Sequence, residues 1–138
     1  MAKASKERPT QVGQEITYLR KAEKYLEGAD LAFEVRNWVS AASLGIHAII
    51  TSCDAVTAKL LHRRFAGGDH QGITNLLGQL PIADDAELKE IMRRVGEIIA
   101  AKTVVEYDDK PVRQDKAKHI LIEARRLVAW AKKHVEKK

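Results

Sequence analysis

A seam of polar side chains runs along one otherwise apolar stretch, residues 38–65. This stretch lacks Pro, and its apolar residues spread around the helical wheel, which is typical of a buried central helix. A buried His or Asp without a hydrogen-bond partner costs about 1–3 kcal/mol, so such a seam must meet other polar groups or a ligand. The spacings of 3, 4, 4 and 3 put five residues on one helix face, and we call them the polar seam: Ser40, Ser43, His47, Thr51 and Asp54.

Two further polar groups have the chemistry to meet the seam. Asp69 and His70 lie in a Gly-rich loop after the central helix, whereas Lys102, Glu106 and Tyr107 lie near the end of a later helix. Taken singly, each has an ordinary reading as a helix cap, a loop residue or an ion-pair partner. In an antiparallel arrangement the end of the later helix approaches the central helix, so we expect His47 and Asp54 to face it. Together they predict a ligand-binding site: Ser43, His47, Thr51, Asp54, His70, Lys102, Glu106 and Tyr107.

The sequence lacks the patterns of common metal and cofactor sites. Its five histidines form no HxxxH pair, and its single cysteine excludes a CxxC motif, so we expect no metal site. Neither GxGxxG nor GxxxxGK[ST] occurs, and there is no GxSxG nucleophile elbow. We therefore expect no cofactor.

Helical periodicity must position these groups. Apolar residues recur at steps of three and four through residues 13–35, 84–107 and 113–135, in addition to the central helix. A short helix over 71–80 lies between the Gly-rich loop and Pro81, and Asp69 and Asp84 or Asp85 are candidate caps. No run of alternating polarity predicts a strand. We predict an all-α, four- to five-helix up-and-down antiparallel bundle, with residues 1–12 as a flexible tail and residues 13–138 as one domain.

The net charge of +5 is concentrated at the two ends of the chain. Residues 110–138 hold ten basic and three acidic side chains. A basic last helix can follow phosphate groups, and its cations equally suit the C-terminal end of the helix dipole. The single cysteine, Cys53, excludes an intrachain disulfide and fits a reducing compartment. The N-terminus lacks the apolar segment of a signal peptide and no run of about 18 apolar residues occurs, so we expect a cytoplasmic protein without membrane contact.

The chain resembles a HEPN domain (higher eukaryotes and prokaryotes nucleotide-binding) over residues 18–135. The resemblance rests on YLRKAEKYLEGADLAFEVRNWVSAASLGIHAIITSCDAV, followed in order by GGDHQGITNLL, AAKTVVEYDDKPV and AKHILIEARRLVAWAKK. It is similar to small stand-alone bacterial HEPN proteins, which implies a helical bundle that forms a homodimer. Many HEPN domains are metal-independent ribonucleases with an Arg-x4–6-His motif that meets its copy across the dimer interface. Others bind nucleotides or pair with a nucleotidyltransferase as toxin and antitoxin.

The nuclease motif of the family departs from its pattern at both positions here. Alignment of the late helix end puts Lys102 where the Arg falls and Tyr107 where the His falls. An imidazole exchanges a proton near neutral pH, for which a phenol is a poor substitute, and Lys lacks the bidentate fork of Arg. His47 and His70 remain as candidates for the missing acid or base.

Three functions follow from these residues. We predict a HEPN-like module that binds a nucleotide, RNA or a protein partner, with a degraded nuclease motif. The first alternative is a metal-independent ribonuclease toxin with a nucleotidyltransferase antitoxin as its partner. The second is a purely structural dimerising bundle, in which the polar seam forms an internal hydrogen-bond network.

Overall fold

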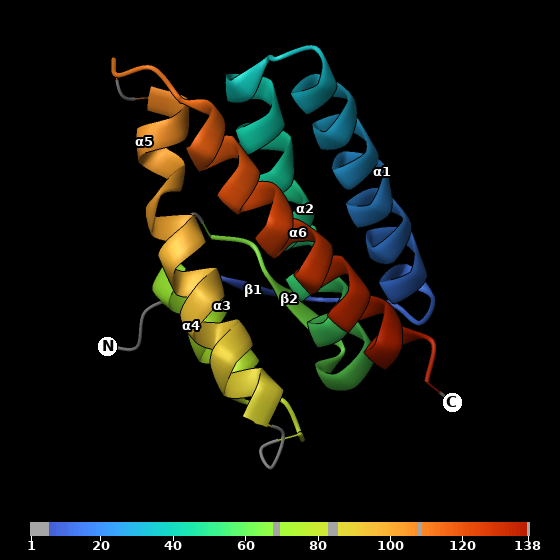
Figure 1. The fold of residues 1–138 in the computed structure, drawn as a ribbon. Helices are drawn as coiled ribbons and strands as arrows, with labels where there is room; N and C mark the ends of the chain where they lie inside the picture. The colour runs from blue at the N-terminus through green and yellow to red at the C-terminus, as the bar shows by residue number, and fades with distance from the viewer. Residues whose placement is uncertain (1–5, 68–69, 83–85, 108, 138) are drawn as a thin grey trace.

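Helices dominate the computed structural model of the chain (Figure 1). The structure describes residues 6–67, 70–82, 86–107 and 109–137, and for residues 70, 71 and 103 it describes the backbone alone. The elements follow in the order β1 (Glu7–Pro9), α1 (Gln14–Glu34), α2 (Trp38–Leu61), β2 (Arg63–Phe65), α3 (His70–Leu77), α4 (Ala86–Ala100), α5 (Lys102–Tyr107) and α6 (Gln114–Val135). The predicted all-α class is confirmed. The proposed caps at Asp69, Asp84 and Asp85 lie outside the described residues.

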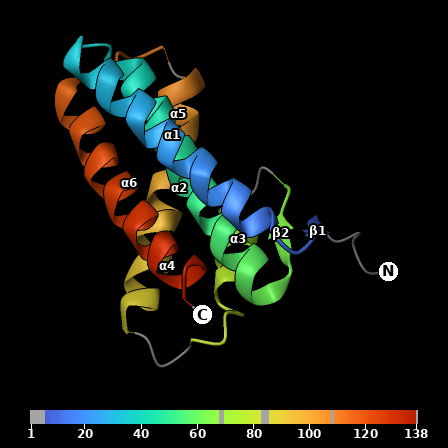
Figure 2. The same cartoon turned by 90° about the vertical axis from the view of Figure 1, so that its right-hand side faces the viewer.

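The central helix α2 packs between α1 and α6, which also contact each other (Figures 1 and 2). It begins after Asn37, whose side-chain Oδ1 accepts a hydrogen bond from the Ser40 backbone N–H at 3.2 Å. Gly45 lies at the close approach of α2 and α6, because a Cβ there would be 2.8 Å from Cγ2 of Ile120. Among the described residues, α2 is the one helix long and apolar enough to cross a membrane, and 61% of its most apolar stretch is buried in the bundle. Such burial is typical of a core helix.

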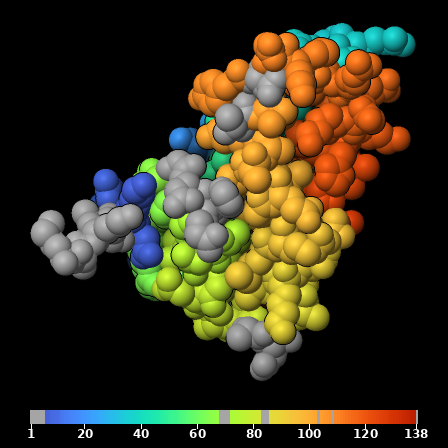
Figure 3. Space-filling view, turned by 90° about the vertical axis from the view of Figure 1, so that its left-hand side faces the viewer, coloured from blue at the N-terminus to red at the C-terminus, as the bar shows by residue number. Residues whose placement is uncertain are grey.

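The helices α3, α4 and α5 cover one flank, where α3 lies beside α4 and α5 continues beyond α4 (Figure 3). The sequence predicted a single helix over 84–107, and this is wrong. The Ala101 backbone N–H donates to the carbonyls of both Glu97 (3.2 Å) and Ile98 (3.0 Å). Such a shared bond is typical of a tightened helix end. The chain therefore starts a second short helix, α5, which packs against α2.

An ion pair joins α4 to α6. Glu123 of α6 is buried, and its Oε1 accepts from Arg94 Nη1 of α4 at 2.7 Å and from Arg126 Nη1 at 3.3 Å. Its Oε2 has no hydrogen-bond partner in the described part of the chain. Because Arg94 and Arg126 remain partly exposed, their charges are less desolvated than that of Glu123.

A two-stranded antiparallel sheet joins the N-terminal segment to the chain that follows α2. Arg8 lies opposite Arg64, and Glu7 pairs with Arg63 at 2.6 Å between Oε1 and Nε. The sequence predicted no strand, and this is wrong for these residues, since segments of three residues are too short to show an alternating pattern. Within the segment expected as a flexible tail, residues 7–9 are therefore hydrogen-bonded to β2.

Candidate functional site

The polar seam meets α5 at one point, which we call the α2–α5 cluster: Ser43, His47 and Glu106. The Ser43 hydroxyl donates to Glu106 Oε1 at 3.2 Å, and the same oxygen lies 3.8 Å from His47 Nε2. The sequence singled out all three residues, and the structure brings them together. The break at Ala101 is what lets α5 place its carboxylate against α2.

The imidazole of His47 is fixed on a second side by α1. The Tyr25 ring lies 5.4 Å from it, centroid to centroid, at an interplanar angle of 31°. The His47 side chain is 42% exposed, whereas that of Glu106 is 17% exposed. The cluster therefore presents a positioned imidazole to solvent, with its carboxylate partner behind it. Such a pair can hold a proton or contact an anionic group.

Lys102 lies one turn before Glu106 on α5 and is partly exposed. Within the described ranges, no carboxylate forms an ion pair with its ammonium group. A lysine on the helix that carries Glu106 has the chemistry of a phosphate contact, as a point charge rather than a bidentate fork.

Asp54 has a different environment from His47, although both belong to the polar seam. Burial raises the pKa of the Asp54 carboxyl to about 7, and the Arg64 guanidinium of β2 opposes that rise. Arg64 itself lies over the Tyr18 ring, 5.8 Å from its centroid. The expectation that Asp54 faces the end of the later helix is therefore not supported, because its charged neighbour is Arg64. Next to it, burial raises the pKa of the Cys53 thiol, as expected for an inert core cysteine.

The remaining predicted residues do not join the cluster. Tyr107 is 76% exposed on α5, and no described residue pairs with it or with the half-buried Thr51. His70 begins α3, but its side chain, like the whole of Asp69, lies outside the described residues. Among the described side chains, no group of three or more His, Cys, Asp or Glu could hold a metal ion.

Sequence reasoning missed the aromatic partners from α1. Tyr18 and Tyr25 are seven residues apart, which puts them on one face of α1 two turns apart. His47 and Asp54 have the same spacing on α2. In an antiparallel pair of helices, matched spacings of this kind place Tyr25 at His47 and Tyr18 near the other end of the seam. The equal spacing of the two tyrosines and of the two seam residues was therefore the signal in the sequence that could have identified these aromatic partners.

The fold and the cluster define an all-α bundle with an imidazole–carboxylate pair, in which α2 supplies the imidazole and α5 the carboxylate. A sequence model of the HEPN domain matches residues 17–135, which is most of the chain. The chain belongs to the HEPN domain family, as its sequence indicated. This family is often linked to nucleotide or RNA binding and to ribonuclease activity. A search of curated proteins gave no match.

Proposed function

We propose that the chain is a HEPN module that binds the phosphate of a nucleotide or of RNA at the α2–α5 cluster. The observation that carries this proposal is the contact of Glu106 with both Ser43 and His47. Glu106 thus holds a half-exposed imidazole at one side, and one helical turn before Glu106 on α5 lies Lys102, which has no ion-pair partner among the described residues. A ring N–H of the imidazole and the ammonium group can both donate hydrogen bonds to one phosphate group, while Glu106 keeps the imidazole in place.

Binding rather than cleavage is favoured by what occupies the two motif positions. Lys102 can attract a phosphate but cannot grip it through two parallel hydrogen bonds, as Arg does. Tyr107 is exposed on α5 rather than directed at the cluster by a described contact. The pair that the nuclease members of the family use is therefore replaced by side chains suited to holding a ligand.

We further propose that a second copy of the chain covers this site. Exposed apolar side chains lie close to it in sequence: Val39 (52% exposed) one turn before Ser43, and Val104 (47%) within α5. Exposed apolar groups around a polar centre are typical of protein interfaces. Sedimentation of the wild type and of Val39→Asp tests this proposal, which predicts a dimer for the first and a shift towards monomer for the second. A monomeric wild type at micromolar concentration contradicts it.

Calorimetric titration tests the proposed binding function. Wild type is titrated with ATP, GTP, UMP and an eight-nucleotide RNA, beside Lys102→Ala and the matched control Lys89→Ala. Lys89 is an exposed lysine of α4. Loss of a phosphate contact should weaken binding by about tenfold in Lys102→Ala and leave Lys89→Ala unchanged. Equal affinity in wild type and Lys102→Ala, or no binding by wild type, would contradict the proposal.

A metal-independent ribonuclease is the second candidate, and the His47–Glu106 pair favours it. An imidazole beside a carboxylate is a common arrangement for general acid–base catalysis. In this reaction His47 takes the proton of a ribose 2′-hydroxyl, whose oxygen attacks the adjacent phosphorus to form a 2′,3′-cyclic phosphate. The displaced 5′-oxygen takes a proton from water and leaves as a hydroxyl. Purified wild type should then cleave RNA in the presence of a chelator, and His47→Ala should not. Expression of wild type in cells should slow their growth, and co-expression of a nucleotidyltransferase encoded nearby should restore it. RNA left intact by the wild type excludes this candidate.

A further inference from the structure

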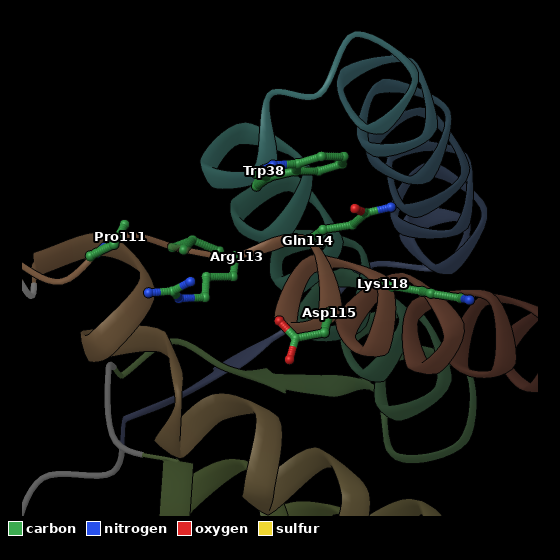
Figure 4. A pocket seen from close by; sticks show the side chains of 7 residues that line it. Trp38, Pro111, Arg113, Gln114, Asp115 and Lys118 are labelled. Atoms are coloured by element: carbon green, nitrogen blue, oxygen red, sulfur yellow. The ribbon is translucent and has the colours of Figure 1, made fainter.

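An open groove lies on the opposite side of α2 from the polar seam. Trp38 and His47 are nine residues apart, or two and a half turns, so they lie on opposite faces of the helix. The cavity has a volume of about 720 Å³ and lies between the start of α2 and the start of α6 (Figure 4). We call it the Trp38 groove, and its lining consists of Trp38, Pro111, Val112, Arg113, Gln114, Asp115 and Lys118.

Trp38 supplies the groove with an aromatic ring whose orientation is restricted by a neighbouring ring. The Phe33 ring packs edge-on against the indole, at 4.9 Å between centroids and an interplanar angle of 63°. The indole remains partly exposed and lines the cavity. A planar group can therefore stack on it without a large loss of side-chain freedom, because the neighbouring ring already restricts the indole.

Two cations reach outward from the groove in opposite directions. In Figure 4 the Arg113 guanidinium extends to one side and the Lys118 ammonium to the other, with Trp38 between them in the view. Within the part of the chain that the structure describes, neither has an acidic partner. Elsewhere, by contrast, Arg63 and Arg94 pair with Glu7 and Glu123.

The single carboxylate of the groove does not neutralise these cations. Asp115 Oδ1 accepts a hydrogen bond from the Lys116 backbone N–H at 3.0 Å, and the carboxylate points away from Trp38 in Figure 4. The groove therefore combines one aromatic plane with two divergent positive charges and a net positive balance.

We propose that the Trp38 groove binds single-stranded nucleic acid, with one base stacked on Trp38 and backbone phosphates on either side at Arg113 and Lys118. Aromatic stacking with flanking cations is how proteins hold unpaired strands without reading their sequence. Because the two cations point in opposite directions, a single phosphate reaches only one of them. The groove should therefore bind an oligonucleotide more tightly than a mononucleotide. It also selects unpaired strands, because bases inside a duplex already stack on one another and cannot reach the indole. This site is separate from the α2–α5 cluster.

Fluorescence tests the proposal with fluorescein-labelled octauridylate, a matched RNA duplex and UMP. A base stacked on Trp38 should quench its indole emission. The change can be assigned to Trp38 because the other tryptophan, Trp130, is buried. Trp38→Leu should weaken octauridylate binding by about five- to a hundredfold, and Trp38→Phe should restore part of it. Arg113→Ala with Lys118→Ala should lower the slope of log affinity against log salt by about 1.4, the value for two phosphate contacts on a single strand.

The matched control is Arg20→Ala with Lys132→Ala, which removes the same charge from exposed positions outside the groove. It should retain the affinity and salt slope of wild type. His47→Ala should leave the quenching intact, so failure of this inference and failure of the proposed function are distinguishable. Wild-type affinity in Trp38→Leu, with circular dichroism showing a folded variant, overturns the proposal. So does equal affinity for the duplex, or an equal loss of affinity in the control variant.

Discussion

Substitution of Asp54 by Asn should stabilise the protein at neutral pH. Its carboxyl is partly buried in α2, and this burial raises its pKa to about 7, against an ordinary value of about 3.9. Between these two pH values the folded chain binds more protons than the unfolded chain. Stability contributed by the protonated form is therefore complete below about pH 4 and is lost as the pH rises towards 7.

The size of the effect follows from the difference in pKa. A rise of about three pKa units corresponds to about 4 kcal/mol, because each unit is worth 1.36 kcal/mol. Partial exposure of Asp54 reduces this value, and Asn also loses the attraction of Arg64, which is worth about 0.2–1 kcal/mol for a partly exposed pair. We therefore expect Asp54→Asn to gain about 1–3 kcal/mol at pH 7.5 and almost nothing at pH 4.

Urea unfolding followed by circular dichroism measures this difference from pH 4 to pH 8. Wild type should lose stability across this range relative to Asp54→Asn, and the two curves should converge at the acid end. Asp115→Asn is the matched control, because it makes the same substitution at a carboxylate that is exposed on α6. If Asp54→Asn is less stable than wild type at pH 7.5, or the difference is constant with pH, the seam carboxylate is instead held by favourable contacts.

Three further substitutions test other contacts. Glu123→Gln should lower the free energy of unfolding by about 1–3 kcal/mol in urea, because Arg94 and Arg126 lose their shared acceptor charge; unchanged stability contradicts this. Gly45→Ala should destabilise by about 1–3 kcal/mol despite a better helix propensity, because the new Cβ meets Cγ2 of Ile120, and Ile120→Ala, which removes that atom, should lower the cost of Gly45→Ala in a double-mutant cycle. Deletion of residues 1–10 should accelerate amide hydrogen exchange at residues 63–65 without unfolding α2; unchanged exchange would show that β2 does not need β1.

The long helices could be predicted from the sequence because each buries a continuous apolar stripe. The stripe of α4 (Leu88, Ile91, Val95, Ile98 and Ile99) is buried as its periodicity indicated. The polar seam was also visible, and so was its meeting with Glu106. These features depend on residue types that recur at helical spacing, which is the strongest signal in a single sequence.

Features that depend on tertiary contacts could not be predicted in the same way. No Pro or Gly marks the break at Ala101 in the sequence, because the break consists of a shared backbone hydrogen bond. The pairing of β1 with β2 joins segments far apart in the chain. Burial of Glu123 depends on the arrival of Arg94 from another helix. Asp54 illustrates the same limit, because its spacing placed it on the seam but did not reveal that Arg64 would be its charged neighbour.

The short helix α5 has a consequence for how any ligand of the cluster is bound. Six residues are far fewer than the roughly 12–15 that a helix needs to persist alone in water, so α5 is helical because it packs on α2. A ligand held by Lys102 and by the His47–Glu106 pair would add to that packing, and folding of α5 and occupancy of the site would favour each other. Amide protection within residues 102–107 would then rise with ligand concentration, which makes this segment a built-in reporter of binding.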